Sequence, residues 1–429
     1  MIHQRKTRYT VWGARLSLLG IALLAAAVSG QGAVKPGLEV LLDKHPELIA
    51  GKRVGIIANH TSVDRQGKSI VERIAEHAPL AALFGPEHGF EGNAEAGAVI
   101  PPSVLKGVPV FSLYGAYKTP TTRMLKDTEV LVYDIQDVGA RFYTYISTLF
   151  LGLCAAKREG IPMIVLDRPN PIGGVAVEGP VTNPVYSSFV GALPLAIRYG
   201  LTAGETAQLM NGETCAGFSL GAKLTVVPME GYRRSMGYDE MGLAWIAPSP
   251  NMPTVETAYV YPGMCLFEGT NLSEGRGTEA PFLTVGAPFL DAKRWLAGVP
   301  EKWRAGIEAE AVTFTPEKIP GKAENPKFVG KKCQGLRLRV TDRNALRPIG
   351  LAVAMLCAAR DLEPKQFQVN TYMDRLWGNE NLRAMLEEGA DCEAILETTE
   401  AEREFFEKAR GKYFMYEGGG SLSESGWPG

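Results

Sequence analysis

Short apolar runs alternate with helical patterns along the first half of the chain. Strands are predicted where an apolar run ends in a polar loop, and helices where apolar residues recur every three or four positions. The predicted strands are 53–59, 80–84, 108–113, 129–133, 162–166 and 223–227, and the predicted helices are 68–77, 144–159 and 202–211. Near-continuous apolar strands separated by helices indicate a mostly parallel sheet covered on both faces.

The second half follows a different pattern. Prolines at positions 248, 250, 253 and 262 predict a boundary segment without helix, because proline interrupts helices and central strands. A glycine-rich loop (269–282), a β-like run (335–340) and helical patterns at 349–360 and 401–410 follow. We therefore expect a smaller α+β domain at 259–429, after a parallel-sheet domain at 34–258.

The N-terminus has the pattern of a secretory signal peptide. Residues 1–15 contain basic residues and no acidic ones, and residues 16–28 form an apolar run that ends in small and polar residues. The run is shorter than the roughly 20 residues of a membrane-spanning helix. We expect residues 1–33 to be removed as a signal peptide, with the cleavage site near residues 29–33. The mature protein is then exported, to the periplasm or the medium, without insertion into the membrane.

Charge and known motifs exclude several classes of protein. The net charge of −2 becomes −6 when the four basic residues of the signal peptide are removed, which argues against a nucleic-acid partner. No Walker A loop, HExxH motif or zinc-type Cys/His spacing is present, and no GxGxxG follows a predicted strand. The sequence therefore predicts neither a cofactor nor a metal site.

Three predicted strands end in loops rich in reactive groups. The loops are 85–92, 134–145 and 167–171. Since ligands bind beyond the carboxyl ends of strands in an open parallel sheet, we expect these loops to meet at one edge. They supply groups for acid–base chemistry on a polar or anionic substrate. The candidate residues are Glu87, His88, Asp134, Asp137, Arg141, Tyr143, Asp167, Arg168 and Asn170.

Each candidate also has a purely structural interpretation. In the structural interpretation, Glu87 is a solvated loop carboxylate. The glycines around it favour a tightly shaped loop instead. His88 is equally open to a core or helix-cap role. Aspartates before a helix commonly cap it, and the arginines of these loops have aspartates nearby as partners. Composition favours surface positions for the polar residues of 269–282, which are Asn271, Glu274, Arg276 and Glu279.

Four loops together resemble those of the NamZ-like exo-β-N-acetylmuramidases, a family of exported bacterial glycoside hydrolases. They are GPEHGFEG (85–92), YDIQDVGARFYTY (133–145), LDRPNPIGG (166–174) and FEGTNLSEGRGTEAPF (267–282). The resemblance extends from about residue 37 to residue 416. It implies a Rossmann-like N-terminal domain, a smaller C-terminal domain and an active-site cleft between them. The implied activity is release of N-acetylmuramic acid from the non-reducing ends of peptidoglycan fragments, so the expected partners are muramyl saccharides; the oligomeric state stays open.

Glycosidases usually employ two carboxyl groups, about 5–5.5 Å apart for retention and about 6.5–9.5 Å apart for inversion. Our hypothesis makes Glu87 the general acid and Asp134 the second carboxylate, with Asp137 or Asp167 as its alternatives. The substrate's 2-acetamido group is an alternative nucleophile.

The remaining candidates are expected to bind substrate. The lactyl carboxylate of muramic acid suits a bidentate arginine, which predicts Arg141 or Arg276 as its receptor. His88 would orient the acid or bind a hydroxyl group, and Tyr143 would form a wall of the site. The other expected substrate contacts are Arg168, Asn170, Asn271 and Glu279.

Two other functions are compatible with parts of this pattern. A non-catalytic exported protein that binds wall fragments would use the same cleft and the same arginines. Constrained carboxyl groups in a glycine-rich loop favour the enzyme over this alternative. A wall esterase or amidase is disfavoured, because no histidine follows His88 and no metal motif is present.

Overall fold

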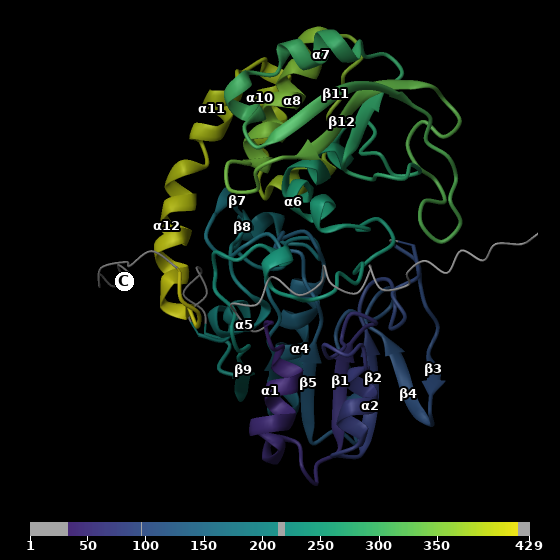
Figure 1. Ribbon diagram of the computed structural model, residues 1–429, viewed down its shortest axis with the longest axis vertical. Coiled ribbons are helices and arrows are strands. Elements are labelled where there is room, and N and C mark those ends of the chain that lie inside the picture. The colour runs from purple at the N-terminus through teal and green to yellow at the C-terminus, as the bar shows by residue number, and fades with distance from the viewer. Residues whose placement is uncertain (1–32, 96, 213–218, 419–429) are drawn as a thin grey trace, which may run out of the picture.

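The computed structural model describes residues 33–95, 97–212 and 219–418 (Figure 1). The predicted signal peptide lies outside these residues except for its last position. A seven-stranded sheet forms the lower part of the molecule in Figure 1, and a three-stranded sheet with most of the later helices forms the upper part. None of the helices in the described ranges is long and apolar enough to cross a bilayer.

The seven-stranded sheet has the order β3-β4-β2-β1-β5-β6-β9. Its neighbouring strands are parallel except for the edge pair β3-β4. This confirms the mostly parallel sheet, and the six predicted strands agree with the observed ones to within one residue at each end. The strands are β1 (Val54–Ala58), β2 (Leu80–Gly85), β3 (Ser103–Leu105), β4 (Val108–Ser112), β5 (Val130–Asp134), β6 (Met163–Leu166) and β9 (Leu224–Val227).

Helices cover both faces of this sheet because both faces are apolar. Neighbouring residues of β1 point to opposite sides: Ile56 packs in a cluster with Leu38 of α1 and Ile70 of α2, and Ile57 packs in the cluster of α4 and α5. This alternation is the period-2 geometry of a strand that is buried on both faces. The helices are α1 (Gly37–Lys44), α2 (Ile70–Ala75), α4 (Tyr145–Glu159) and α5 (Ala203–Asn211); a short α3 (Thr122–Leu125) precedes β5.

The C-terminal part is a smaller α+β domain, as predicted. Its antiparallel sheet has the order β10-β12-β11, formed by β10 (Thr284–Ala287), β11 (Ile307–Phe314) and β12 (Cys333–Val340). Its helices are α7 (Ala292–Gly298), α8 (Pro348–Leu362), α9 (Tyr372–Trp377), α10 (Asn381–Glu388) and α11 (Cys392–Glu397). A small hairpin of β7 (Glu178–Val181) and β8 (Ala196–Arg198) lies between the two sheets in Figure 1.

The prediction that the proline-dense segment lacks helix is wrong. Helix α6 (Val255–Met264) begins after Thr254, whose side chain caps it, and includes Pro262. Close packing explains why the helix tolerates the proline: a Cβ atom at Gly263 would lie 1.9 Å from the Pro348 carbonyl oxygen of α8. Burial of α6 against α8 outweighs the one backbone hydrogen bond that the proline removes.

The last helix returns to the N-terminal sheet domain. Helix α12 (Glu400–Arg410) descends along the side of the molecule in Figure 1. The buried guanidinium of Arg410 donates hydrogen bonds to backbone carbonyls of residues 174, 175, 199 and 200. One apolar cluster also runs through both parts of the chain. The two domains are therefore held together by a shared core, and the limits 34–258 and 259–429 stay a prediction.

Candidate active site

The loop after β2 has a shape that only glycine permits at several positions. A Cβ atom at Gly92 would lie 1.8 Å from the ring of His60, and one at Gly85 would lie 2.7 Å from the backbone nitrogen of Phe90. Gly89 and Gly92 also adopt positive φ values of 79° and 67°, which side chains disfavour. The chain therefore turns tightly around Glu87.

Glu87 is held between two loops. One carboxylate oxygen (Oε2) accepts a hydrogen bond of 2.7 Å from the hydroxyl of Thr144, and the other (Oε1) accepts one of 3.1 Å from the Gly97 N–H. The side chain is 9% exposed. Burial, together with the nearby Glu87 carboxylate, raises the pKa of Tyr114 to about 12. The carboxyl ends of β2 and β5 thus meet at Glu87, as predicted from the parallel sheet.

His88 shapes this loop. It has a positive φ of 70°, an unfavourable conformation for a residue with a side chain, and its Nδ1 lies 2.8 Å from the carbonyl oxygen of Ala94. Burial lowers the pKa of His88, which favours the neutral imidazole. His88 does not line the cavity beside Glu87, so its position fits support of the loop better than contact with a sugar.

A cleft of about 480 Å³ opens at Glu87 between the two domains. This volume suits a small saccharide. The N-terminal domain contributes Tyr114, Lys118, Phe142, Tyr143, Thr144 and Phe189 to its walls. The C-terminal domain and α6 contribute Tyr261, Glu268, Arg276, Tyr372 and Arg375. Of the residues predicted from the sequence, the structure brings Glu87, Tyr143 and Arg276 together in this cleft.

Glu268 is a second carboxyl group in the same cleft. It lies in the 3₁₀ turn η4 (Cys265–Gly269), and one carboxylate oxygen accepts a hydrogen bond of 2.8 Å from Arg276. Arg276 also lies 3.5 Å from Glu274, so two carboxylates surround it. We did not single out Glu268 from the sequence. The available signal was its place in the 267–282 motif, eight residues before an arginine.

Comparison with known proteins identifies the family of most of the chain. Residues 54–256 match the family model for the N-terminal part of the exo-β-N-acetylmuramidase NamZ, and residues 259–416 match the model for its C-terminal part. The chain belongs to the NamZ family. The peptidoglycan β-N-acetylmuramidase NamZ of Bacillus subtilis (strain 168) is 42% identical over 389 residues, which cover 89% of this chain and 91% of that protein.

Solved structures show the same fold. Two DUF1343 family proteins of Bacteroides fragilis NCTC 9343 superpose with TM-scores of 0.81 and 0.73, at 32% and 31% identity. Each comparison covers 90% of this chain and 99% of the other. This chain therefore shares its overall fold with these two solved proteins.

Asp134 does not line the cleft. It is fully buried at the end of β5, where the guanidinium of Arg168 donates to both of its carboxylate oxygens. Burial raises the pKa of Asp134, and Arg168 opposes that shift. This pairing is the structural interpretation that the sequence also allowed for Asp134 and Arg168. The position of Asp134 therefore does not support its predicted role as the second catalytic carboxylate.

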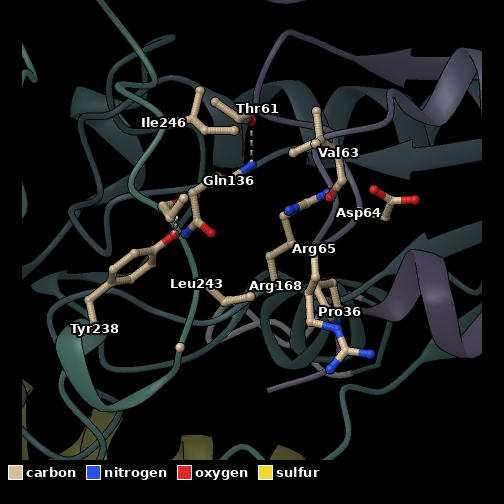
Figure 2. Close-up of a pocket in the computed structure, with 13 residues that line it drawn as sticks. Pro36, Thr61, Val63, Asp64, Arg65, Gln136, Arg168, Tyr238, Leu243 and Ile246 are labelled. Atoms are coloured by element: carbon tan, nitrogen blue, oxygen red, sulfur yellow. Dashed lines mark hydrogen bonds between the residues drawn. The ribbon is translucent and has the colours of Figure 1, made fainter. Parts of the chain in front are cut away.

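Figure 2 shows the small pocket beside this ion pair. It lies beyond the ends of β1 and β5, where the strand order reverses and ligands often bind in open α/β sheets. Here the Arg168 side chain reaches the carbonyl oxygen of Val63 at 2.8 Å, and Thr61 accepts a hydrogen bond from the backbone of Gln136 (Figure 2). The remaining volume of about 90 Å³ is too small for a sugar.

Asp137 and Asp167, the alternatives to Asp134 as second carboxylate, are also buried and bonded to other protein groups. Asp137 accepts hydrogen bonds from the Gly139 N–H and the Tyr199 hydroxyl, and burial raises its pKa to about 6. Asp167 accepts from Thr202 and Gly204 at the start of α5, and burial raises its pKa to about 7. Neither lines the cleft.

Arg141 holds the two domains together rather than facing the cleft. Its guanidinium donates to the backbone carbonyls of Pro180 and Leu195 and to those of Leu376 and Trp377 in α9. Burial lowers its pKa to about 9. The group is therefore committed to four protein acceptors, and a substrate carboxylate would have to displace them.

The remaining predicted contacts do not line the cleft. The side chain of Asn170 accepts a hydrogen bond from the Ile172 N–H of its own loop and donates one to the carbonyl oxygen of Leu201. Asn271 ties its loop to the backbone of residues 366 and 368. Glu279 is exposed on the surface and does not line the cleft. The hydrogen bonds of Asn170 and Asn271 stabilise their own loops, and the positions of these side chains do not support the predicted contacts with substrate.

Proposed function

We propose that this protein is an exo-acting β-N-acetylmuramidase that hydrolyses terminal N-acetylmuramic acid from the non-reducing end of peptidoglycan fragments. The observation that carries the proposal is Glu87, a buried and doubly hydrogen-bonded carboxyl group in a cleft of saccharide size. Family membership and the 42% identity to the Bacillus subtilis peptidoglycan β-N-acetylmuramidase support the same substrate.

In the proposed reaction, the Glu87 carboxylic acid gives its proton to the glycosidic oxygen as the bond from that oxygen to the anomeric carbon breaks. Positive charge develops on the sugar ring in the transition state, and water finally adds to the anomeric carbon. Glu268 also lines the cleft. It either takes the proton of the attacking water or positions the 2-acetamido group as an internal nucleophile.

The role of Glu87 is tested by Glu87→Gln. This change keeps the shape of the side chain and removes the acidic proton, so we expect kcat on a chromogenic β-N-acetylmuramide to fall by about 100-fold or more. Glu91→Gln is the matched control in the same loop, because Glu91 is exposed and does not line the cleft. Wild-type turnover by Glu87→Gln would refute the assignment. Tight saccharide binding by the wild-type protein without release of sugar would favour a binding module.

We also propose export through the N-terminal segment 1–33, which supports a role on wall fragments outside the cytoplasm. The basic start and apolar run of this segment carry the proposal. Cell fractionation with N-terminal sequencing of the mature protein tests it. A full-length protein found in the cytoplasmic fraction would overturn it.

A further inference from the structure

We propose that Arg375 and Lys118 form the receptor for the lactyl carboxylate of the bound sugar. This inference rests on the proposed function and deepens it, because it names the residues that distinguish a muramyl sugar from one without the lactyl group. The two cations come from different domains: Lys118 lies in the loop after β4 and Arg375 lies in α9.

The two arginines predicted from the sequence to bind the carboxylate are both occupied by protein partners. Arg276 lines the cleft but pairs with Glu268 and Glu274. Arg141 is committed to four backbone carbonyls and is fully buried. A cation whose hydrogen-bond donors are already paired has little left to offer an incoming carboxylate. The two arginines predicted from the sequence are therefore poor receptors.

Arg375 and Lys118 differ from these arginines in their partners. Both line the cleft and both are exposed. Within the described ranges, the Arg375 side chain forms no hydrogen bond or ion pair, and the Lys118 side chain has no carboxylate partner. Lys118 lies instead over the ring of Phe189, 4.5 Å from its centre. Among the residues that the structure describes, these two positive charges have no counter-ion, so they complement the charge of an anionic sugar.

Contacts with the surroundings position the backbone that carries Arg375 and the aromatic ring beneath Lys118. The Arg141 guanidinium binds the carbonyls of Leu376 and Trp377, which follow Arg375 directly in α9. Phe189 packs against Tyr114, the neighbour of Glu87, at a ring distance of 5.8 Å. Lys118 therefore extends the wall that contains the proposed acid. A carboxylate next to the reacting sugar would meet Arg375 and Lys118 while the glycosidic bond faces Glu87.

The test uses two chromogenic β-muramides, one with a free lactyl carboxylate and one whose carboxylate is blocked as a neutral amide. We expect the wild-type enzyme to prefer the free acid. Arg375→Ala should lower kcat/KM for the free acid by about 10- to 100-fold and leave kcat/KM for the amide nearly unchanged. For Arg375→Lys, kcat/KM for the free acid should lie between the values of the wild type and Arg375→Ala, because lysine keeps the positive charge but lacks the planar guanidinium fork. Lys118→Ala should reduce the same preference.

Controls separate the receptor role from loss of structure. Arg294→Ala changes an exposed arginine of α7, at the top of the molecule in Figure 1, and should leave both rates unchanged. Equal losses on both compounds, or no loss in Arg375→Ala, would overturn the inference. So would a wild-type enzyme without preference for the free acid. Hydrolysis of neither compound by the wild-type enzyme would refute the proposed function itself, and the receptor with it.

Discussion

At the scale of single residues, the carboxyl groups of this protein fall into two classes. Glu87 and Glu268 line the cleft, where a substrate can reach them. Asp134, Asp137 and Asp167 lie buried among protein donors. A glycosidase needs carboxyl groups that reach the glycosidic bond, so position in the cleft makes Glu268 the better partner for Glu87.

We therefore expect Glu268→Gln to lower kcat on a chromogenic β-N-acetylmuramide by about 100-fold, because the cleft then lacks its second carboxylate. Glu274→Gln is the matched control, since Glu274 also pairs with Arg276 but does not line the cleft. That control should change thermal stability more than kcat. If both variants lose kcat equally, Glu268 acts only by holding Arg276.

At the scale of elements, α9 depends on a residue far away in the sequence. Arg141, in the loop after β5, donates to two carbonyl groups of α9 and to two next to or within the β7–β8 hairpin. Removing the guanidinium would leave buried carbonyl groups without donors. One side chain thus joins α9 and the hairpin to the N-terminal sheet domain.

Arg141→Ala should therefore lower the free energy of unfolding by about 3–5 kcal/mol. Urea unfolding followed by circular dichroism measures this change, with Arg294→Ala as the exposed control. Wild-type stability with a raised KM for the muramide would instead favour the substrate-receptor role that we predicted from the sequence.

At the scale of the whole molecule, buried carboxyl groups make stability depend on pH. The Tyr416 hydroxyl near the C-terminus donates to Asp167 at the end of β6. Burial raises the pKa of Asp167 from 3.8 to about 7, so the folded state binds this proton more tightly than the unfolded chain does. The stability that the proton contributes is present below about pH 4 and is lost as the pH rises to about 7.

We expect the wild-type protein to lose free energy of unfolding between pH 5 and pH 7, and Asp167→Asn to lose less over the same interval. Urea denaturation at the two pH values measures the difference. An unchanged pH dependence in Asp167→Asn would show that other groups produce it, with Asp137 the first to examine because burial raises its pKa to about 6.

The sequence by itself determined the sheet and the position of Glu87. Strands such as 54–58 and helices such as 145–159 depend on local apolar periodicity, which is readable from neighbouring residues. The parallel order brings the loops after β2 and β5 to one edge, and glycines at 85, 89 and 92 mark the shaped loop around Glu87. Helix α6 could not be predicted in this way, because its packing on α8 outweighs the local effect of Pro262.

Only the tertiary structure decided which charged side chains face the cleft. Arg141 finds partners at residues 376 and 377, and Glu87 finds one at Thr144. Contacts this distant in the sequence depend on how the elements pack, and no local pattern encodes them. The tertiary structure therefore pairs Asp134 with Arg168 outside the cleft, and it places Glu268 and Arg375 in the cleft with Glu87.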